Sequence, residues 1–174
     1  MNRFLARAMS VALIAAPGLA LAQDGWTGFY VGGHIAATDT EVSFAGLGTS
    51  ENSTGFGLHA GYNHNLNDRI VLGGELSRGK LEYSDLAFDE DLTSERVKIR
   101  LGYTTGSALF YGVAGYARIS DSDEDEDGHT LGLGVDYKLT SNVLLGAELM
   151  YDSFSADGID LDVTSLSFRV SYRF

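Results

Sequence analysis

Phe168–Phe174, with the sequence FRVSYRF, alternates apolar and polar side chains up to the last residue. Successive side chains of a β-strand point to opposite faces. One face of this segment carries Phe168, Val170, Tyr172 and Phe174. The other face carries Arg169, Ser171 and Arg173. The pattern predicts a strand that separates an apolar environment from a polar one.

Residues 1–22 have the pattern of a secretory signal peptide. Arg3 and Arg7 precede an apolar stretch that ends on the A-x-A cleavage site Ala20-Leu21-Ala22. The stretch is short for a spanning helix, and no apolar run of about 18 residues follows it. We therefore expect a cleaved signal peptide at 1–22 and one domain at 23–174.

Composition narrows the class of protein. The signal peptide holds two of the twelve Lys and Arg residues, so ten remain against 24 acidic residues, a net charge near −14. Such an acidic chain argues against a nucleic-acid partner. The chain has no cysteine, although export would permit disulfides. These features favour a protein of the bacterial cell envelope.

The alternation recurs in eight runs of about ten residues, which is typical of barrel strands. The runs lie near residues 27–37, 54–63, 70–77, 96–103, 109–118, 131–138, 143–152 and 168–174. In most runs the charges mark the inner face. In the fifth run we place Leu109, Tyr111 and Val113 outward. We place inward Gly112, Ala114, Tyr116 and Arg118.

The connections between the runs alternate in length. Those after the first, third, fifth and seventh runs are long and acidic, whereas the other three are a few residues each. In an antiparallel meander, all long loops then lie on one side of the sheet. This layout predicts an all-β fold, an eight-stranded antiparallel up-and-down transmembrane β-barrel in the bacterial outer membrane.

Aromatic residues support a lipid boundary at the short-turn end. Tyr62, Tyr103 and Tyr137 each come just before a short turn. At the same level we expect Trp26, Tyr172 and Phe174. Together they predict a periplasmic aromatic girdle. For an outer girdle the candidates are Tyr83, Tyr151 and Phe154.

The sequence resembles the small eight-stranded outer-membrane barrels, close to the alpha-proteobacterial surface-antigen and opacity-protein group and, more distantly, OmpX and the OmpA membrane domain. The resemblance covers residues 23–174 and rests on Trp26–Gly33, Gly73–Glu75 and Gly132–Tyr137. It implies that the outer-membrane assembly machinery recognises a C-terminal signal formed by Phe168, Val170, Tyr172 and Phe174. It implies a fold and a location, but no ligand.

Charged residues on the inner faces predict a network in the lumen, which eight strands leave barely wide enough for side chains. Its expected members are Glu75, Lys98, Arg100, Arg118, Asp136, Glu148 and Arg169. Confined charges must pair, so we expect Glu75 and Glu148 to bridge the cations. Such a network either fills and holds the barrel or lines a narrow path for ions or small solutes.

Signals of catalysis are weak, and we expect no enzyme, no cofactor and no metal site. Some barrels of this size modify lipid A, and His129 lies near the outer rim, but Thr130 and Leu131 follow it rather than an H-x-S arrangement. The segment Asp121–Gly128 contains the first half of a calcium loop. The second half of the motif is absent, because Gly134 occupies the position at which a calcium loop has a glutamate. We interpret the segment as a solvated acidic loop, with weak divalent-ion binding as the alternative.

The expected partners follow from this location and charge. The barrel contacts outer-membrane lipid and lipopolysaccharide, and it uses the assembly machinery for insertion. Its acidic loops make a cationic ligand, or one bridged by divalent ions, the candidate surface partner. We expect a monomer. The sequence leaves three functions open: a structural or surface-interaction role, a narrow channel, and lipid modification.

Overall fold

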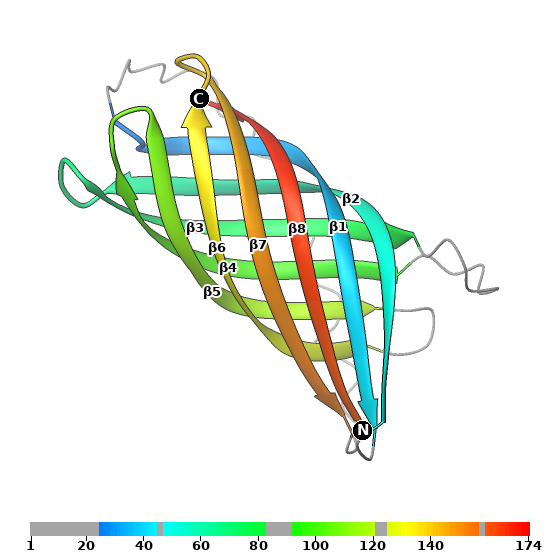
Figure 1. Cartoon of the computed structure of the whole chain (residues 1–174). Coiled ribbons are helices and arrows are strands. Elements are labelled where there is room, and N and C mark those ends of the chain that lie inside the picture. The colour runs from blue at the N-terminus through cyan, green and yellow to red at the C-terminus, as the bar shows by residue number, and fades with distance from the viewer. Residues whose placement is uncertain (1–24, 45–46, 83–91, 121–124, 157–158) are drawn as a thin grey trace, which may run out of the picture.

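The computed structural model describes residues 25–44, 47–82, 92–120, 125–156 and 159–174. Its strands (Figure 1) are β1 (Gly28–Phe44), β2 (Leu47–Asn65), β3 (Ile70–Glu82), β4 (Leu92–Thr104), β5 (Ala108–Ser120), β6 (Asp125–Lys138), β7 (Val143–Ala156) and β8 (Ile159–Arg173). Within these ranges, no helix is long and apolar enough to cross a membrane. The expected signal peptide lies outside the described residues.

The strands form a closed antiparallel barrel. Each strand pairs with the next in sequence, and β8 pairs with β1. This confirms the predicted fold class. The stagger of the barrel can be read from the register. When the paired residues are followed from strand to strand, starting at Ile70 of β3, one full circuit returns to β3 at Lys80, which is ten residues further along the strand. That stagger tilts the strands by about 40° from the barrel axis.

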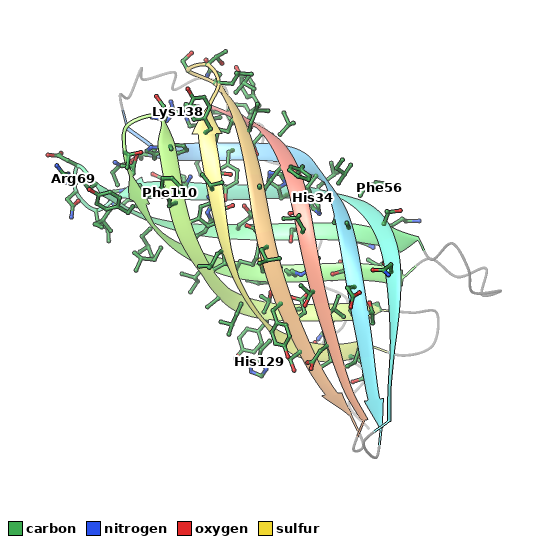
Figure 2. All side chains as sticks on the ribbon, in the orientation of Figure 1. His34, Phe56, Arg69, Phe110, His129 and Lys138 are labelled. Carbon is green, nitrogen blue, oxygen red and sulfur yellow. The ribbon has the colours of Figure 1, made fainter. Side chains whose placement is uncertain are left out.

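The short turns lie together at one end of the barrel. Residues 66–69, 105–107 and 139–142 connect the strands there, beside the C-terminus (Figure 1). Figure 2 shows Arg69 and Lys138 near this end and His129 towards the opposite end. The alternation of turn lengths identifies the short-turn end as periplasmic.

The opposite, outer end differs in part from the prediction. β1 and β2 stay paired from Gly28 and Asn63 out to Phe44 and Leu47, beyond the predicted runs 27–37 and 54–63. Most of this acidic connection is therefore a strand hairpin rather than a loop. Residues 45–46, 83–91, 121–124 and 157–158 lie outside the described residues. They include the first half of the predicted loop at Asp121–Gly128, whereas its second half, from Asp125 on, belongs to β6 and is strand rather than loop.

The barrel is turned inside out relative to a soluble protein. Its outward face is apolar, with Leu133 68% and Phe168 59% exposed. Its inward face holds charges, and Glu148 is only 4% exposed. This distribution suits a wall with lipid outside and polar side chains inside. The predicted faces are confirmed for every strand except β5.

The predicted orientation of β5 is wrong. Leu109, Tyr111 and Val113 are buried in the lumen, whereas Phe110 and Tyr116 are exposed on the outer wall. The segment from 109 to 117 has no charge, so its period-two pattern marks no polar face. The periplasmic half of the lumen contains a cluster of buried apolar side chains, so large apolar side chains fit there as well as on the lipid side.

Two predicted girdle aromatics also lie elsewhere. At the periplasmic level, Tyr62, Tyr103, Tyr137, Tyr172 and Phe174 are exposed as expected. Trp26, however, is 1% exposed and lies inside the barrel mouth. At the outer end Tyr151 faces outward, but Phe154 is buried in a lumen cluster with Ala117 and Val163. Tyr83 lies outside the described residues.

Candidate functional site

A network of charged side chains crosses the middle of the lumen. Each strand involved places its charge inward because the charge occupies the inner position of the period-two pattern. Six of the predicted members are brought together, each at most 4% exposed: Glu75, Lys98, Arg100, Asp136, Glu148 and Arg169. They come from β3, β4, β6, β7 and β8, so the network ties distant parts of the wall together.

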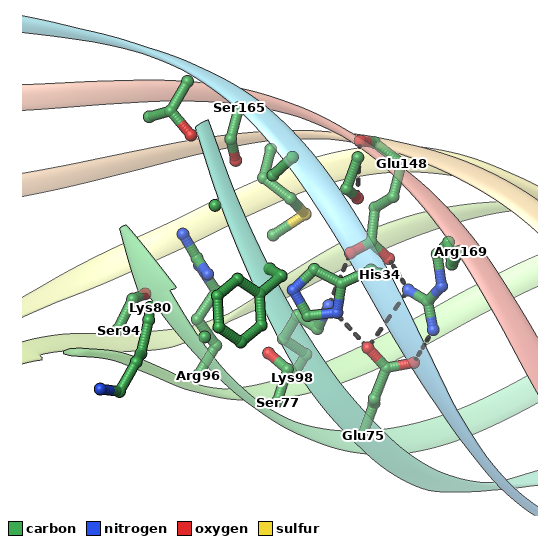
Figure 3. A pocket seen from close by; sticks show the side chains of 17 residues that line it. His34, Glu75, Ser77, Lys80, Ser94, Arg96, Lys98, Glu148, Ser165 and Arg169 are labelled. Atoms are coloured by element: carbon green, nitrogen blue, oxygen red, sulfur yellow. Dashed lines mark hydrogen bonds and ion pairs between the residues drawn. The ribbon is translucent and has the colours of Figure 1, made fainter. Parts of the chain in front are cut away.

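Glu75 is the centre of the network. Its carboxylate lies 2.7 Å from the Lys98 ammonium nitrogen and 3.1 Å from Nη1 of Arg100. Both terminal guanidinium nitrogens of Arg169, Nη1 and Nη2, donate to it as well (Figure 3). The hydroxyl of Tyr30 donates a further hydrogen bond of 2.7 Å. Glu75 therefore contacts four side chains from three other strands.

Two further carboxylates complete the charge balance. Glu148 accepts from Lys98 and from Arg169, each at 2.6 Å. Asp136 accepts from Arg100. Three carboxylates thus face three cations, and the cluster is neutral as a whole. Buried charges are tolerated only when paired in this way.

Sequence reasoning missed the part that tyrosines play in the network. Tyr30 also accepts a hydrogen bond of 2.8 Å from Arg100. Tyr111 donates to Glu148 at 3.1 Å, and the Arg100 guanidinium carbon lies 3.8 Å from the centre of the Tyr111 ring. Neither tyrosine was predicted as a member of the network, and the predicted orientation of β5 placed Tyr111 outward.

Arg118 is not part of the lumen network, which corrects the prediction. It lies on the outer wall of β5, where its guanidinium pairs with Asp127 of β6 at 2.7 Å. The side chains are 45% and 69% exposed. Arg118 lies beyond the apolar part of the strand, where an outward charge meets headgroups and water rather than hydrocarbon. Its charge was therefore no guide to the inner face.

Trp26 lies in the periplasmic mouth of the lumen. Its indole nitrogen donates to Thr104 Oγ1 at 2.6 Å, and its backbone nitrogen donates to Asn65 at 2.8 Å. Lys138 lies 4.7 Å from the centre of the ring. Apolar lumen side chains pack against it, among them Val71, Leu109 and Leu144. The segment before β1 therefore folds into the barrel as a plug.

Polar side chains line part of the outer half of the lumen, beside the apolar cluster of Ala117, Phe154 and Val163. A cavity of about 30 Å³ lies on the outer side of the charge network, lined in part by His34, Ser94, Arg96 and Ser165 (Figure 3). It has room for about two water molecules. Beside it, Arg96 pairs with Asp152 at 2.5 Å. Nδ1 atoms of His34 and His59 are 3.4 Å apart.

The outer rim contains a histidine, a serine and an acid at neighbouring positions. His129 is the register partner of Ser153, and Ser153 is the partner of Asp162. A catalytic triad needs the histidine between the serine and the acid, whereas here the serine lies in the middle. The His129 ring lies against Tyr116, with 5.4 Å between centroids. No described hydrogen bond joins it to Ser153.

No metal centre is apparent in the described part of the chain. No group of three or more His, Asp and Glu side chains is placed there to hold an ion. In the described part of the acidic segment, Asp127 is paired with Arg118. The half calcium motif therefore gains no support from these residues.

A closed barrel with an apolar outer belt and a charged, filled lumen defines a small outer-membrane β-barrel protein. The chain belongs to the outer membrane protein beta-barrel domain family, whose model matches residues 8–174. It is 32% identical to the 22 kDa outer membrane protein of Rhizobium leguminosarum bv. viciae, over 82% of this chain and 71% of the relative.

Two more similarities agree with this assignment. The 31 kDa outer-membrane immunogenic protein of Brucella melitensis is 27% identical, over 85% of this chain and 80% of the relative. The crystal structure of Neisserial surface protein A superposes with a TM-score of 0.62 at 25% identity, covering 85% of this chain and 98% of that one. The protein is accordingly located in the bacterial outer membrane.

Proposed function

We propose that this protein is a sealed, non-conducting barrel that anchors acidic hairpins at the cell surface and acts by structural or adhesive contacts there. The observation that supports this most is the double closure of the lumen. The neutral network around Glu75 fills its middle, and Trp26 fills its periplasmic mouth. Barrels that hold aqueous channels generally have about 16 to 18 strands.

The acidic balance of the chain favours a surface role. Residues 23–174 hold 24 acidic and ten basic side chains. Six of the basic ones point into the lumen or its mouth, where carboxylates or carbonyls hold them: Arg96, Lys98, Arg100, Lys138, Arg169 and Arg173. Excess negative charge therefore lies outside the lumen, and it attracts cationic partners by long-range steering.

A narrow channel is the second candidate, favoured by the polar side chains in the outer half of the lumen. The cavity at His34 and Arg96 and the hydroxyls around it would admit water from outside. An ion would then have to break contacts of Lys98 or Arg169 with Glu75 and displace Trp26. Lipid modification is the third candidate. Within the described residues, its support is the adjacency of His129 and Ser153, and this support is weak because Ser153 lies between His129 and Asp162.

Proteoliposomes test the proposal. The protein of residues 23–174 is refolded into vesicles, and its folding is checked by heat-dependent gel mobility. We expect the fluorescence of an entrapped ion-sensitive dye to change no more in these vesicles than in empty ones. The vesicles are expected to bind polylysine, and the binding is expected to weaken with salt and in D123N/D125N/D127N. Dye response in the presence of folded barrel, or polylysine binding that the variant leaves unchanged, would contradict it. Acyl-chain loss from added lipid A, followed by mass spectrometry, would instead favour the enzyme.

A further inference from the structure

The apolar belt ends at a similar level on every strand. In the order β3 to β8, then β1 and β2, its outermost exposed members are Leu76, Val97, Tyr116, Leu131, Tyr151, Leu166, Ile35 and Phe56. The next outward positions, in the same order, are Arg78, Glu95, Arg118, His129, Ser153, Thr164, Ala37 and Thr54. These eight positions form the outer rim, at the depth where lipid headgroups begin.

Positive charge at this rim is confined to one side. All ten basic residues of 23–174 are described, and six of them belong to the lumen or its mouth. Of the remaining four, Arg69 lies at a periplasmic turn. The other three are Arg78 and Lys80 on β3 and Arg118 on β5. On the rim of β7, β8, β1 and β2, the described side chains include no basic residue.

The register brings Arg78 and Arg118 into one row, and Lys80 lies two residues further out on β3. Arg78 pairs with Glu95 of β4, Glu95 with Arg118, and Arg118 with Asp127. Arg78 and Arg118 are thus two strand spacings, about 10 Å, apart. Arg78 lies 3.3 Å from Glu95, and its side chain is 72% exposed. Tyr116, 68% exposed, is the outermost belt residue of β5 and lies two residues before Arg118.

Exposed ion pairs of this kind contribute little to stability, about 0 to 1 kcal/mol each. A guanidinium has five N–H donors in a planar fork and can hold a carboxylate and a phosphate together. The rest of the chain is strongly acidic and repels anionic headgroups. The basic side is therefore the part of the rim that fits an anionic lipid.

We propose that Arg78, Lys80 and Arg118, here termed the basic rim, bind the phosphate groups of a phosphorylated glycolipid of the outer leaflet. The lipid lies beside β3, β4 and β5 with its acyl chains along Leu76, Val97 and Tyr116. This site is separate from the lumen network and adds an oriented lipid contact to the proposed surface role. It also fixes which side of the barrel faces the phosphorylated lipid.

Nanodiscs of phosphatidylcholine with lipid A test the proposal. Native mass spectrometry of the released barrel measures the fraction that retains lipid A. We expect a fall of about fivefold for R78Q or R118Q, since one basic residue near an anionic surface contributes about a factor of five. The matched control R69Q removes an exposed outward charge at the periplasmic end and is expected to leave retention unchanged. E95Q is expected to raise it, because Arg78 loses its competing carboxylate.

Three further arms separate the sources of binding. Dephosphorylated lipid A is expected to be retained poorly, and free inorganic phosphate is expected not to compete. EDTA is expected to leave retention intact, because guanidinium contacts need no divalent ion. The proposal would be overturned by equal retention in R118Q and R69Q, by retention of the dephosphorylated lipid, by competition from free phosphate, or by loss of binding in EDTA. Heat-dependent gel mobility verifies that each variant is folded.

Discussion

Glu75 is the residue whose loss unbalances the lumen. It contacts Lys98, Arg100 and Arg169, and its removal leaves three buried cations against two carboxylates. Breaking a buried ion pair by removing one partner typically costs 3–5 kcal/mol. We expect Glu75→Gln to lower the free energy of unfolding by roughly that amount, measured by urea unfolding in lipid vesicles.

The exposed pair at the rim provides the control for this substitution. Glu95→Gln removes a carboxylate that is 40% exposed and paired with Arg78, so we expect a loss below about 1 kcal/mol. Equal urea midpoints for the two variants would mean that the lumen network contributes no more to the free energy of unfolding than a surface ion pair does.

Glycines on the inner faces make room for the tyrosines of the network. A Cβ at Gly134 would lie about 2.3 Å from Cζ of Tyr111, and Gly112, on the outer face of β5, has no neighbour nearer than 4.0 Å. We expect Gly134→Ala to cost about 1–3 kcal/mol by pushing Tyr111 away from Arg100 and Glu148. Gly112→Ala is expected to change the urea midpoint little, and a similar loss in both variants would contradict this packing.

At the scale of the strand, β5 presents Phe110 and Tyr116 to lipid and Leu109 and Tyr111 to the lumen. The chain has no cysteine, so a single one can be introduced and labelled with a fluorophore. We expect brominated lipid to quench the label at Phe110→Cys and to leave it unquenched at Leu109→Cys. The opposite result would restore the orientation that the sequence pattern suggested.

The segment before β1, which contains Trp26, is a second element whose position differs from the prediction, because it lies inside the barrel mouth and not at the barrel surface. Trp26 is the one tryptophan of the chain, and it is 1% exposed. We expect its fluorescence to be blue-shifted and resistant both to aqueous iodide and to brominated lipid, because it lies inside the mouth. Quenching by brominated lipid would place it in the aromatic girdle instead.

These two elements show what the sequence could and could not predict. Seven strands were oriented correctly because one face carries a charged or histidine side chain, such as Arg100 or His59, and the other face carries an apolar row. β5 has no charge before Arg118, so both of its faces fit either side. Trp26 belongs to no alternating run, and its burial depends on Thr104 and Asn65, which are distant in sequence. Local periodicity cannot report such contacts.

The charge network in the lumen, like the strand orientations, was predicted in part from the sequence. The pairing of Glu75 and Glu148 with Lys98, Arg100 and Arg169 follows from the narrow lumen and the inner positions of their strands. The hydrogen bonds of Tyr30 and Tyr111 depend on their height along the tilted strands, which the stagger of the closed barrel sets. That stagger is a property of all eight pairings together.

At the scale of the whole molecule, the eight strands form a wall whose interior is filled from both directions. Neutral charge pairs lie in the middle, an indole lies at the periplasmic mouth, and a cavity of about 30 Å³ lies on the outer side of the charge network. The acidic hairpins and the basic rim then lie on one side of the membrane. Contacts with lipids and surface partners therefore belong to the wall and the hairpins rather than to a pore.

Conductance across a planar bilayer tests the sealed lumen most directly. The folded, inserted protein of residues 23–174 is expected to give no current steps, and Trp26→Ala is expected to stay silent because the network around Glu75 remains. Discrete steps in the unmodified protein, changed in size or selectivity by Glu75→Gln or Arg100→Gln, would contradict the account and establish a channel.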